Sequence, residues 1–219
     1  WPNNTASEFA KMTAYKYYSF NDKNGNSYFS KYPIENVTSF NDERISRFAD
    51  IKKIKLNKED SFYLVNCHLN SFGISRQEIE YINDTKNIVK DSETHGKSLV
   101  AKLKNGFEFR TKSTDLLLEN LPEDNLPLVI CGDFNDTPLS YTYSQMSIAG
   151  LKDAFITSSK GIGKTYCGPL PLLRIDYFWY NDNVKVIDYK RIRQTTSDHY
   201  PLMMSFSIKK GIEEEVDEF

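Results

Sequence analysis

The chain has 219 residues, of which 39% are hydrophobic, 26% charged and 14% aromatic. This length and composition are typical of one globular domain and exclude collagen-like, coiled-coil and wholly disordered chains. Lysine and arginine together number 28 against 30 acidic residues, so the formal charge of −2 supplies no overall field that would hold the chain on a polyanion.

The first third of the sequence predicts a short helix followed by extended segments. Residues 7–14 can form a helix with Phe9 and Met12 on one face. Extended segments are expected at 15–20, 28–34, 45–56 and 61–69. The last of these is apolar along most of its length, which is typical of a strand that is buried on both faces.

Two helices are predicted between the strand at 61–69 and the middle of the chain. Ser75 and Glu78 fit a capping box, which predicts a helix as far as about residue 89. After a polar break at 91–96, residues 99–121 are expected to form a second helix, with an interruption left open. Its inward face should carry four residues at helical spacing, Leu99, Leu103, Phe107 and Leu117.

The second half of the sequence predicts a central strand and three later strands. Residues 126–131 form an apolar run that is too short for a helix and is followed by Gly132. Thr137 and Pro138 predict the start of the next helix, with threonine as the cap. Strands are expected at 175–180, 184–189 and 202–208, before an acidic tail at 209–219. The element order favours an α/β sandwich, with residues 1–219 in a single domain.

Polar side chains of kinds used in catalysis occur at the ends of the apolar strands. They are His68 and Asn70, Asp133 and Asn135, Asp176, and Asp198 and His199. Taken alone, an aspartate after a glycine is usually a turn former and a single histidine is usually structural. Their combination at strand ends instead predicts one functional site at the rim of the sandwich, where a rigid sheet fixes the geometry.

The candidate residues lie in four motifs, which occur in the order Asn66-Cys67-His68-Leu69, Gly132-Asp133-Phe134-Asn135, Arg174-Ile175-Asp176-Tyr177 and Ser197-Asp198-His199-Tyr200-Pro201. These motifs resemble, in order and context, those of the endonuclease/exonuclease/phosphatase superfamily, the deoxyribonuclease-like metal-dependent phosphoesterases. Together with the segment Ser30-Lys31-Tyr32-Pro33-Ile34, the resemblance runs from about residue 28 to residue 208. It implies a four-layer α/β/β/α sandwich and hydrolysis of a phosphodiester or phosphomonoester by a magnesium-assisted, in-line attack of water.

The resemblance also implies a role for each catalytic residue. Asp133 is the expected base or orienter of the attacking water. His68, Asn135 and protonated His199 are expected to donate hydrogen bonds to the phosphoryl oxygens, on which negative charge develops. Asp176 is expected to keep His199 charged and oriented.

Metal and substrate contacts follow from the same resemblance. Asp198 is the expected ligand for magnesium, with manganese as the alternative, because hard divalent cations prefer oxygen ligands. Asn70 is a candidate substrate contact, although hydrogen bonding within its own loop explains it equally well. The sequence leaves nucleic acid, phospholipid and small-molecule phosphate esters open as substrates, and it indicates no obligate protein partner.

The N-terminus departs from the family pattern. Family members carry an asparagine and a metal-binding glutamate before the region where this chain begins at Trp1. We therefore expect the chain to lack the first strand or strands of the fold and to be impaired relative to a longer parent. The motifs are most similar to a bacterial branch with membrane-anchored members, which implies a cell-envelope location for that parent. The two absent residues also favour an alternative, a non-catalytic module on the same fold that binds a phosphate ligand or a protein.

Three further patterns have structural explanations. The run Gly161-Ile162-Gly163-Lys164-Thr165 resembles part of a phosphate-binding loop, but Ser158 stands where the earlier glycine is required. Cys67 and Cys131 lie within apolar strands and are expected to be buried thiols. The lysines at 52–55 are expected to form the solvent-exposed face of a strand.

Overall fold

The computed structural model describes most of the chain. The described residues are 3–13, 15–21, 25–37, 48–71, 92–168, 172–193 and 196–209, with 3–7 and 92–97 described by their backbone only. The helix predicted at 75–89 and nearly all of the predicted acidic tail lie outside these ranges.

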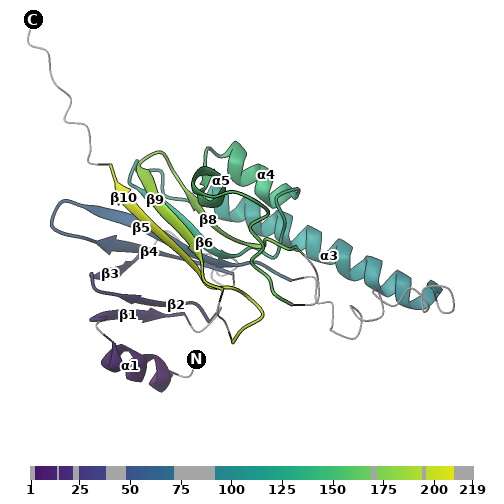
Figure 1. The fold of residues 1–219 in the computed structure, drawn as a ribbon, viewed down its shortest axis with the longest axis horizontal. Coiled ribbons are helices and arrows are strands. Elements are labelled where there is room, and N and C mark those ends of the chain that lie inside the picture. The colour runs from purple at the N-terminus through teal and green to yellow at the C-terminus, as the bar shows by residue number, and fades with distance from the viewer. Residues whose placement is uncertain are drawn as a thin grey trace, which may run out of the picture.

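A mixed sheet of six strands forms the centre of the molecule (Figure 1). Its strands, in spatial order, are β3 (Ile34–Asn36), β4 (Ala49–Lys55), β5 (Ser61–His68), β6 (Leu128–Asp133), β8 (Asp176–Tyr180) and β7 (Lys152–Asp153). β5 and β6 are parallel and every other neighbouring pair is antiparallel. The two apolar runs that predicted buried strands therefore occupy the middle of the sheet, where both faces are covered.

Alternate side chains of the central strands enter two different cores. Val65, Ile130 and Trp179 point to one face, which is covered by the helices α3 (Ser92–Glu119) and α4 (Tyr141–Ile148). Val129 and Tyr180 point to the other face. There they pack against the hairpin of β9 (Val184–Arg191) and β10 (Leu202–Ile208). Because successive side chains point to opposite faces and both faces are covered, the middle strands are apolar along most of their length.

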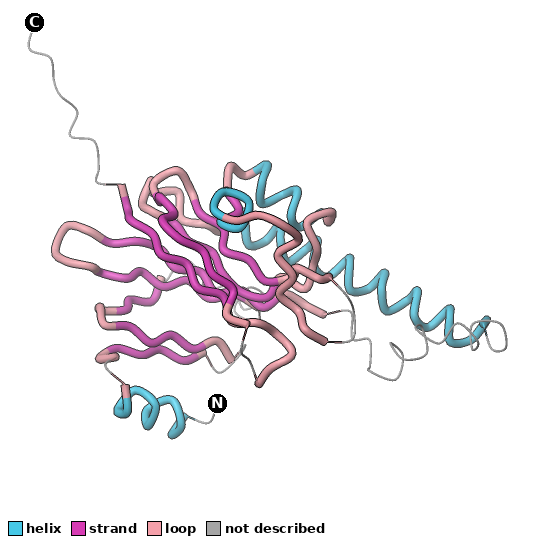
Figure 2. Tube along the Cα trace, viewed as in Figure 1, coloured by secondary structure: helices cyan, strands magenta, loops and turns pink. Residues whose placement is uncertain are grey.

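A second hairpin and two short helices complete the fold (Figure 2). The hairpin joins β1 (Tyr17–Phe20) to β2 (Ser27–Ser30), and α1 (Asn3–Met12) packs on it through Phe9, whose ring lies 4.8 Å from that of Phe29. The helix α5 (Ala154–Ser158) follows β7. The predicted α/β sandwich is confirmed, and its second β layer consists of two separate hairpins on the same face of the central sheet. A cavity of about 640 Å³, lined by residues of β2, β5 and β10, lies between these hairpins.

The long helix α3 differs from its prediction. It runs without interruption from Ser92 through the expected polar break. The break contains Gly96, and one glycine within a helix lowers its stability by only about 1 kcal/mol relative to alanine. Its inward face near the sheet carries Gly106, Arg110, Thr114 and Leu117. Phe107 was expected on that face but is 50% exposed, since it lies one position away from the line of residues that contacts the sheet.

Two smaller predictions were also wrong. The helix expected to start at Thr137 and Pro138 begins at Tyr141, and Ser140 is its cap, with its Oγ accepting the Tyr143 N–H at 3.2 Å. Lys52 was expected on a solvent-exposed face but is buried. Its Nζ lies 3.0 Å from Asp50 Oδ2 and donates to Asn36 Oδ1 at 2.7 Å, so its charge is paired inside the protein.

Other structural explanations were largely correct. Cys67 is buried as expected, whereas Cys131 is half-buried. Desolvation raises the pKa of the Cys67 thiol and raises that of Cys131 to about 12, so both side chains are neutral thiols. The segment from Gly161 to Thr165 is irregular and no helix follows it directly, as the mismatch to a phosphate-binding loop predicted. Within the described ranges, no helix combines the length and apolar character that crossing a membrane requires.

Candidate active site

The register of three neighbouring strands places the candidate residues in one row. His68 at the end of β5 is opposite Asp133 at the end of β6, and Asp133 is opposite Asp176 at the start of β8. Because side chains alternate along a strand, these three point to the face that carries Val129 and Tyr180. The sheet therefore brings together residues that are far apart in sequence, from His68 to Asp176.

Gly132 permits the close approach of β5 and β6 at this row. A Cβ at Gly132 would lie 1.9 Å from the carbonyl oxygen of Cys67, and the residue has a φ of 136°. No other residue type fits such a contact and such a backbone conformation without strain. The glycine that precedes Asp133 is thus required by the packing of the strands that carry His68 and Asp133.

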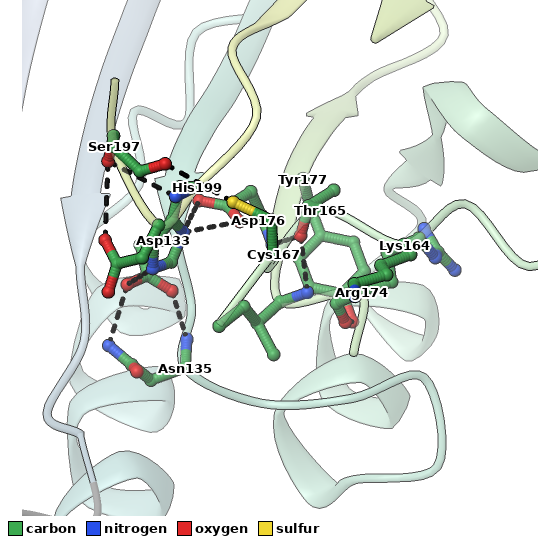
Figure 3. Close-up of polar contacts among 12 residues, drawn as sticks. Asp133, Asn135, Lys164, Thr165, Cys167, Arg174, Asp176, Tyr177, Ser197 and His199 are labelled. Atoms are coloured by element: carbon green, nitrogen blue, oxygen red, sulfur yellow. Dashed lines mark hydrogen bonds and ion pairs between the residues drawn. The ribbon is translucent and has the colours of Figure 1, made fainter. Parts of the chain in front are cut away.

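Asp133 Oδ2 is the point on which the other groups converge, and Figure 3 shows Asp133 with Asn135, Asp176 and His199 around it. It lies 3.7 Å from His68 Nε2 and 4.0 Å from His199 Nε2, and it accepts a hydrogen bond from Asn135 Nδ2 at 3.0 Å. Five of the predicted site residues thus gather at one place, the fifth being Asp176 through its contact with His199.

Asn135 reaches Asp133 through an unusual backbone conformation. Its φ is 49°, in the left-handed region, which asparagine tolerates better than most residues. The turn lets its backbone N–H donate to Asp133 Oδ1 at 2.8 Å, while Nδ2 donates to Asp133 Oδ2 and to the carbonyl of Leu69, the latter at 2.9 Å. These bonds fix both carboxylate oxygens of Asp133.

His199 is held by Asp176 and by its own loop. Its Nδ1 lies 2.9 Å and 3.1 Å from the two oxygens of Asp176. An ionised carboxylate can only accept, so Nδ1 carries the proton and donates it. The His199 N–H donates to Ser197 Oγ at 3.2 Å, and the ring of Tyr166 packs edge-on against the imidazole at 5.2 Å.

The charges of the site are incompletely balanced. Burial raises the pKa of Asp133 to about 6, helped by the negative charge of Asp176 and opposed by the Asn135 N–H and the two histidines. The hydrogen bond to Asp176 raises the pKa of His199 above its usual value, although partial burial opposes this. The group therefore holds a carboxyl that titrates near neutrality beside an imidazole that favours its protonated form.

Asp198 and Asn70 are placed less centrally. Asp198 directly precedes His199, is exposed, and its charge contributes to the raised pKa of His199. Its carboxylate is not part of the group formed by Asp133, Asp176 and His199, whose ligand atoms all lie within 4.8 Å of one another. Asn70 is exposed two residues beyond His68, and its carbonyl accepts from Arg110 Nη1 at 3.0 Å. The roles of both residues remain predictions.

A hard divalent cation fits this donor set. Asp133 and Asp176 present two carboxylates close together, and burial together with the negative charge of Asp176 raises the pKa of Asp133. Oxygen ligands and a deficit of positive charge are what magnesium or manganese requires.

A cavity of about 370 Å³ opens beside these residues. Its lining includes Asp133, Asp176 and His199, together with Tyr200 and Pro201 from the following loop. The larger cavity between the two hairpins is lined by none of the three site residues. A substrate that reaches Asp133 is therefore expected to enter the smaller one.

Two supporting residues were not predicted from the sequence. Arg110 is fully buried in α3 and its Nε lies 3.2 Å from Asp136 Oδ2, which links the helix to the loop after β6. Thr165 is also fully buried, and its hydroxyl contacts the start of β8. A charged residue within a helix gives no local signal of burial. Thr165 stood out in the sequence only as the last residue of the run that begins at Gly161.

The comparison of the sequence with protein-family models decides the family. The model described as Endonuclease/Exonuclease/phosphatase family matches residues 2–199. The chain belongs to this family. Members of the endonuclease/exonuclease/phosphatase family are hydrolases that act on phosphoesters and generally use a divalent metal. A search of curated proteins gives no significant match.

Solved structures of family members share the fold. An endonuclease/exonuclease/phosphatase from Bacteroides vulgatus is 17% identical, with a TM-score of 0.62 over 94% of this chain and 81% of that chain. A mannosyl-6-phosphatase from Bacteroides thetaiotaomicron is 14% identical, with a TM-score of 0.59 over 94% and 82%. The catalytic domain of human Nocturnin is 20% identical, with a TM-score of 0.51. There the match covers 74% of this chain and about half, 53%, of that chain.

Proposed function

We propose that this member of the endonuclease/exonuclease/phosphatase family hydrolyses a phosphate ester at the group of residues around Asp133. The observation that carries the proposal is the convergence on Asp133 Oδ2, which has His68 Nε2 at 3.7 Å, His199 Nε2 at 4.0 Å and Asn135 Nδ2 at 3.0 Å. One carboxylate within reach of three hydrogen-bond donors matches the needs of water attack on phosphorus.

The chain's own residues have separable tasks in this reaction. Asp133 accepts a proton from the attacking water, for which a pKa of about 6 suits reaction near neutral pH. His68 and protonated His199 donate toward phosphoryl oxygens as negative charge develops there. Asp176 keeps the Nδ1 proton of His199 in place and so leaves Nε2 directed to the substrate.

The proposed cofactor is magnesium or manganese, with Asp198 as the ligand that the family resemblance implies and the neighbouring carboxylates of Asp133 and Asp176 as further oxygen donors. When bound, the cation supplies positive charge that offsets the charge developing on the phosphoryl oxygens. Few carboxylates are available for this role, and Asp176 also accepts a hydrogen bond from His199. We therefore expect the chain to bind the cation weakly.

Hydrolysis of two synthetic substrates tests the function. Bis(4-nitrophenyl) phosphate reports diesterase activity and 4-nitrophenyl phosphate reports monoesterase activity. The wild type should hydrolyse at least one in magnesium or manganese and lose that activity in EDTA. Asp133→Asn should lower kcat by about 10²- to 10⁴-fold, because the proton acceptor is removed.

Asp188→Asn is the matched control, since Asp188 pairs with Lys190 on β9 and takes no part in the group around Asp133. Its rate should equal that of the wild type. Unchanged turnover in Asp133→Asn, or equal losses in both variants, would contradict the proposal.

A further inference from the structure

Thr165 lies behind the pair formed by Asp176 and His199. It belongs to the loop between α5 and β8 and is fully buried. The proposed chemistry gives this residue no task, because its side chain is not among the groups around Asp133 Oδ2. A buried hydroxyl must nevertheless be hydrogen-bonded, and its partners here are informative.

The hydroxyl of Thr165 binds the backbone that carries Asp176. Its Oγ1 accepts the N–H of Ile175 at 3.0 Å and the N–H of Asp176 at 3.1 Å (Figure 3). Two successive backbone amides therefore converge on one oxygen at the first residue of β8. This arrangement fixes the point from which the Asp176 side chain extends toward His199.

The backbone of the same segment binds the loop that carries His199. The carbonyl of Thr165 accepts the N–H of Tyr200 at 2.8 Å, and the N–H of Cys167 donates to the carbonyl of Asp198 at 2.7 Å. Tyr166 and His199 face each other in an isolated antiparallel bridge. The segment from Thr165 to Cys167 is thus paired with the residues on both sides of His199.

The segment is itself anchored to the sheet. The N–H groups of Thr165 and Tyr166 donate to the carbonyl of Leu173 at 2.8 Å and 3.1 Å. Arg174, the next residue, is buried and paired with Asp153, and its guanidinium lies over the rings of Phe155 and Tyr177 at 4.8 Å and 4.7 Å. The segment that carries Thr165 is therefore tied to the sheet by several contacts.

We propose that Thr165 is the positioning residue that holds Asp176 and His199 in register, its hydroxyl fixing the carboxylate and its carbonyl fixing the loop of the imidazole. This inference deepens the proposed function and rests on it for its effect on turnover. The effect on the Asp176–His199 hydrogen bond is independent of turnover and can be measured alone. A displacement of about 1 Å between reacting groups is enough to slow an enzyme substantially.

Thr165→Val and Thr165→Ser separate the hydroxyl from the shape of the side chain. Valine has nearly the volume of threonine but offers no acceptor, so the N–H groups of Ile175 and Asp176 lose their partner. Serine keeps the acceptor and loses only a methyl group. A positioning role therefore predicts a defect in Thr165→Val and rescue in Thr165→Ser.

The readout is the imidazole Nδ1–H signal of His199 in proton NMR of the chain labelled with ¹⁵N-histidine, at one fixed pH. The chain has three histidines, and His199→Gln assigns the signal by removing it. Thr165→Val should lose or broaden the signal and lower kcat by about 10- to 100-fold with KM changed by less than about twofold. Thr165→Ser should retain the signal and most of the turnover.

Thr114→Val is the matched control. Thr114 is also fully buried, and its Oγ1 donates to Thr142 Oγ1 at 3.1 Å between α3 and α4. It should lose stability as Thr165→Val does while keeping the His199 signal and kcat. If Thr165→Val does not fold, Thr165→Cys replaces it under the same criteria, since a thiol is a weaker acceptor.

Two results would overturn the inference. The first is that the folded Thr165→Val chain keeps the wild-type His199 signal and kcat. The second is that Thr114→Val loses the His199 signal and kcat as Thr165→Val does. A wild type that hydrolyses neither nitrophenyl ester but has a His199 signal that depends on the Thr165 hydroxyl would sink the proposed function alone and leave the positioning role standing.

Discussion

Asp133 sets the charge balance of the site, and its cost to stability can be measured. Its carboxyl keeps a proton up to about pH 6 in the folded chain, whereas an ordinary aspartate has a pKa of 3.8. Between these values the folded state binds more protons than the unfolded state. The free energy of unfolding therefore falls as the pH rises from about 4 to about 6, and the loss is complete above about pH 7.

Asp133→Asn should consequently stabilise the chain near pH 7.5. In EDTA we expect the free energy of unfolding to rise by about 1–2 kcal/mol. This is less than the full pKa shift of Asp133 implies, because asparagine has one acceptor oxygen and cannot accept both hydrogen bonds of Asn135. At pH 4 the gain should disappear, since Asp133 is already protonated there. Urea unfolding at the two pH values measures both.

Asp182→Asn is the control for this prediction. Asp182 is exposed, and its hydrogen bond with Lys152 lowers its pKa, so removal of its charge should not stabilise the chain at pH 7.5. A gain in Asp133→Asn that is the same at pH 4 and pH 7.5 would show that burial of the charge is not its cause.

Asn135 allows a second test at the residue scale. Glycine and alanine both remove its side-chain hydrogen bonds, but only alanine places a Cβ on a backbone with a φ of 49°. We expect Asn135→Gly to be more stable than Asn135→Ala by about 0.5–1 kcal/mol in urea unfolding. At Ser144, an exposed position within α4, the order should reverse, because alanine favours a helix. The same order at both positions would contradict the role of the left-handed turn.

At the scale of elements, the parallel pairing of β5 with β6 depends on Gly132. Gly132→Ala should cost at least about 3 kcal/mol, because its Cβ would overlap the Cys67 carbonyl at 1.9 Å. Gly150→Ala should cost only about 1–2 kcal/mol, since Gly150 also has a positive φ, 81°, but has open space around its Cβ position. Equal shifts of the urea midpoint would show that the close approach of the strands does not matter.

The strands were predictable from the sequence because their signal is local. The middle strands β5 and β6 are continuous apolar runs, and burial on both faces produces such runs directly. Element boundaries were less certain where two local signals competed. Thr137 with Pro138 and Ser140 both offer a helix start, and only the packing of α4 against α3 selects Ser140.

The candidate site was predicted in part for the same reason. His68, Asp133 and Asp176 lie at the ends of strands that are neighbours in the sheet, and their pairing brings the three residues together. Arg110 and Thr165 act through contacts with residues distant in sequence or across a loop, and no periodicity marks them. The exposed Phe107 shows the same limit within α3, where a shift of one position changes which face is buried.

For the whole molecule, binding of a cation to the folded state should raise stability. If magnesium binds with a Kd on the order of 1 mM, as expected for a site with few carboxylates, about 10 mM should add about 1.4 kcal/mol to the free energy of unfolding. Thermal unfolding with increasing magnesium measures this. Asp133→Asn should abolish the gain, whereas Asp188→Asn should retain it.

The most direct measurement of the central claim is the paramagnetic broadening of NMR signals by a small amount of manganese in the presence of inorganic phosphate. The signals of His68, Asn135 and His199 should broaden first, while those of Thr114 and Trp179 in the helix-covered core persist. Manganese that broadens another region first, or the whole chain evenly, would contradict a metal-dependent phosphoesterase site at Asp133.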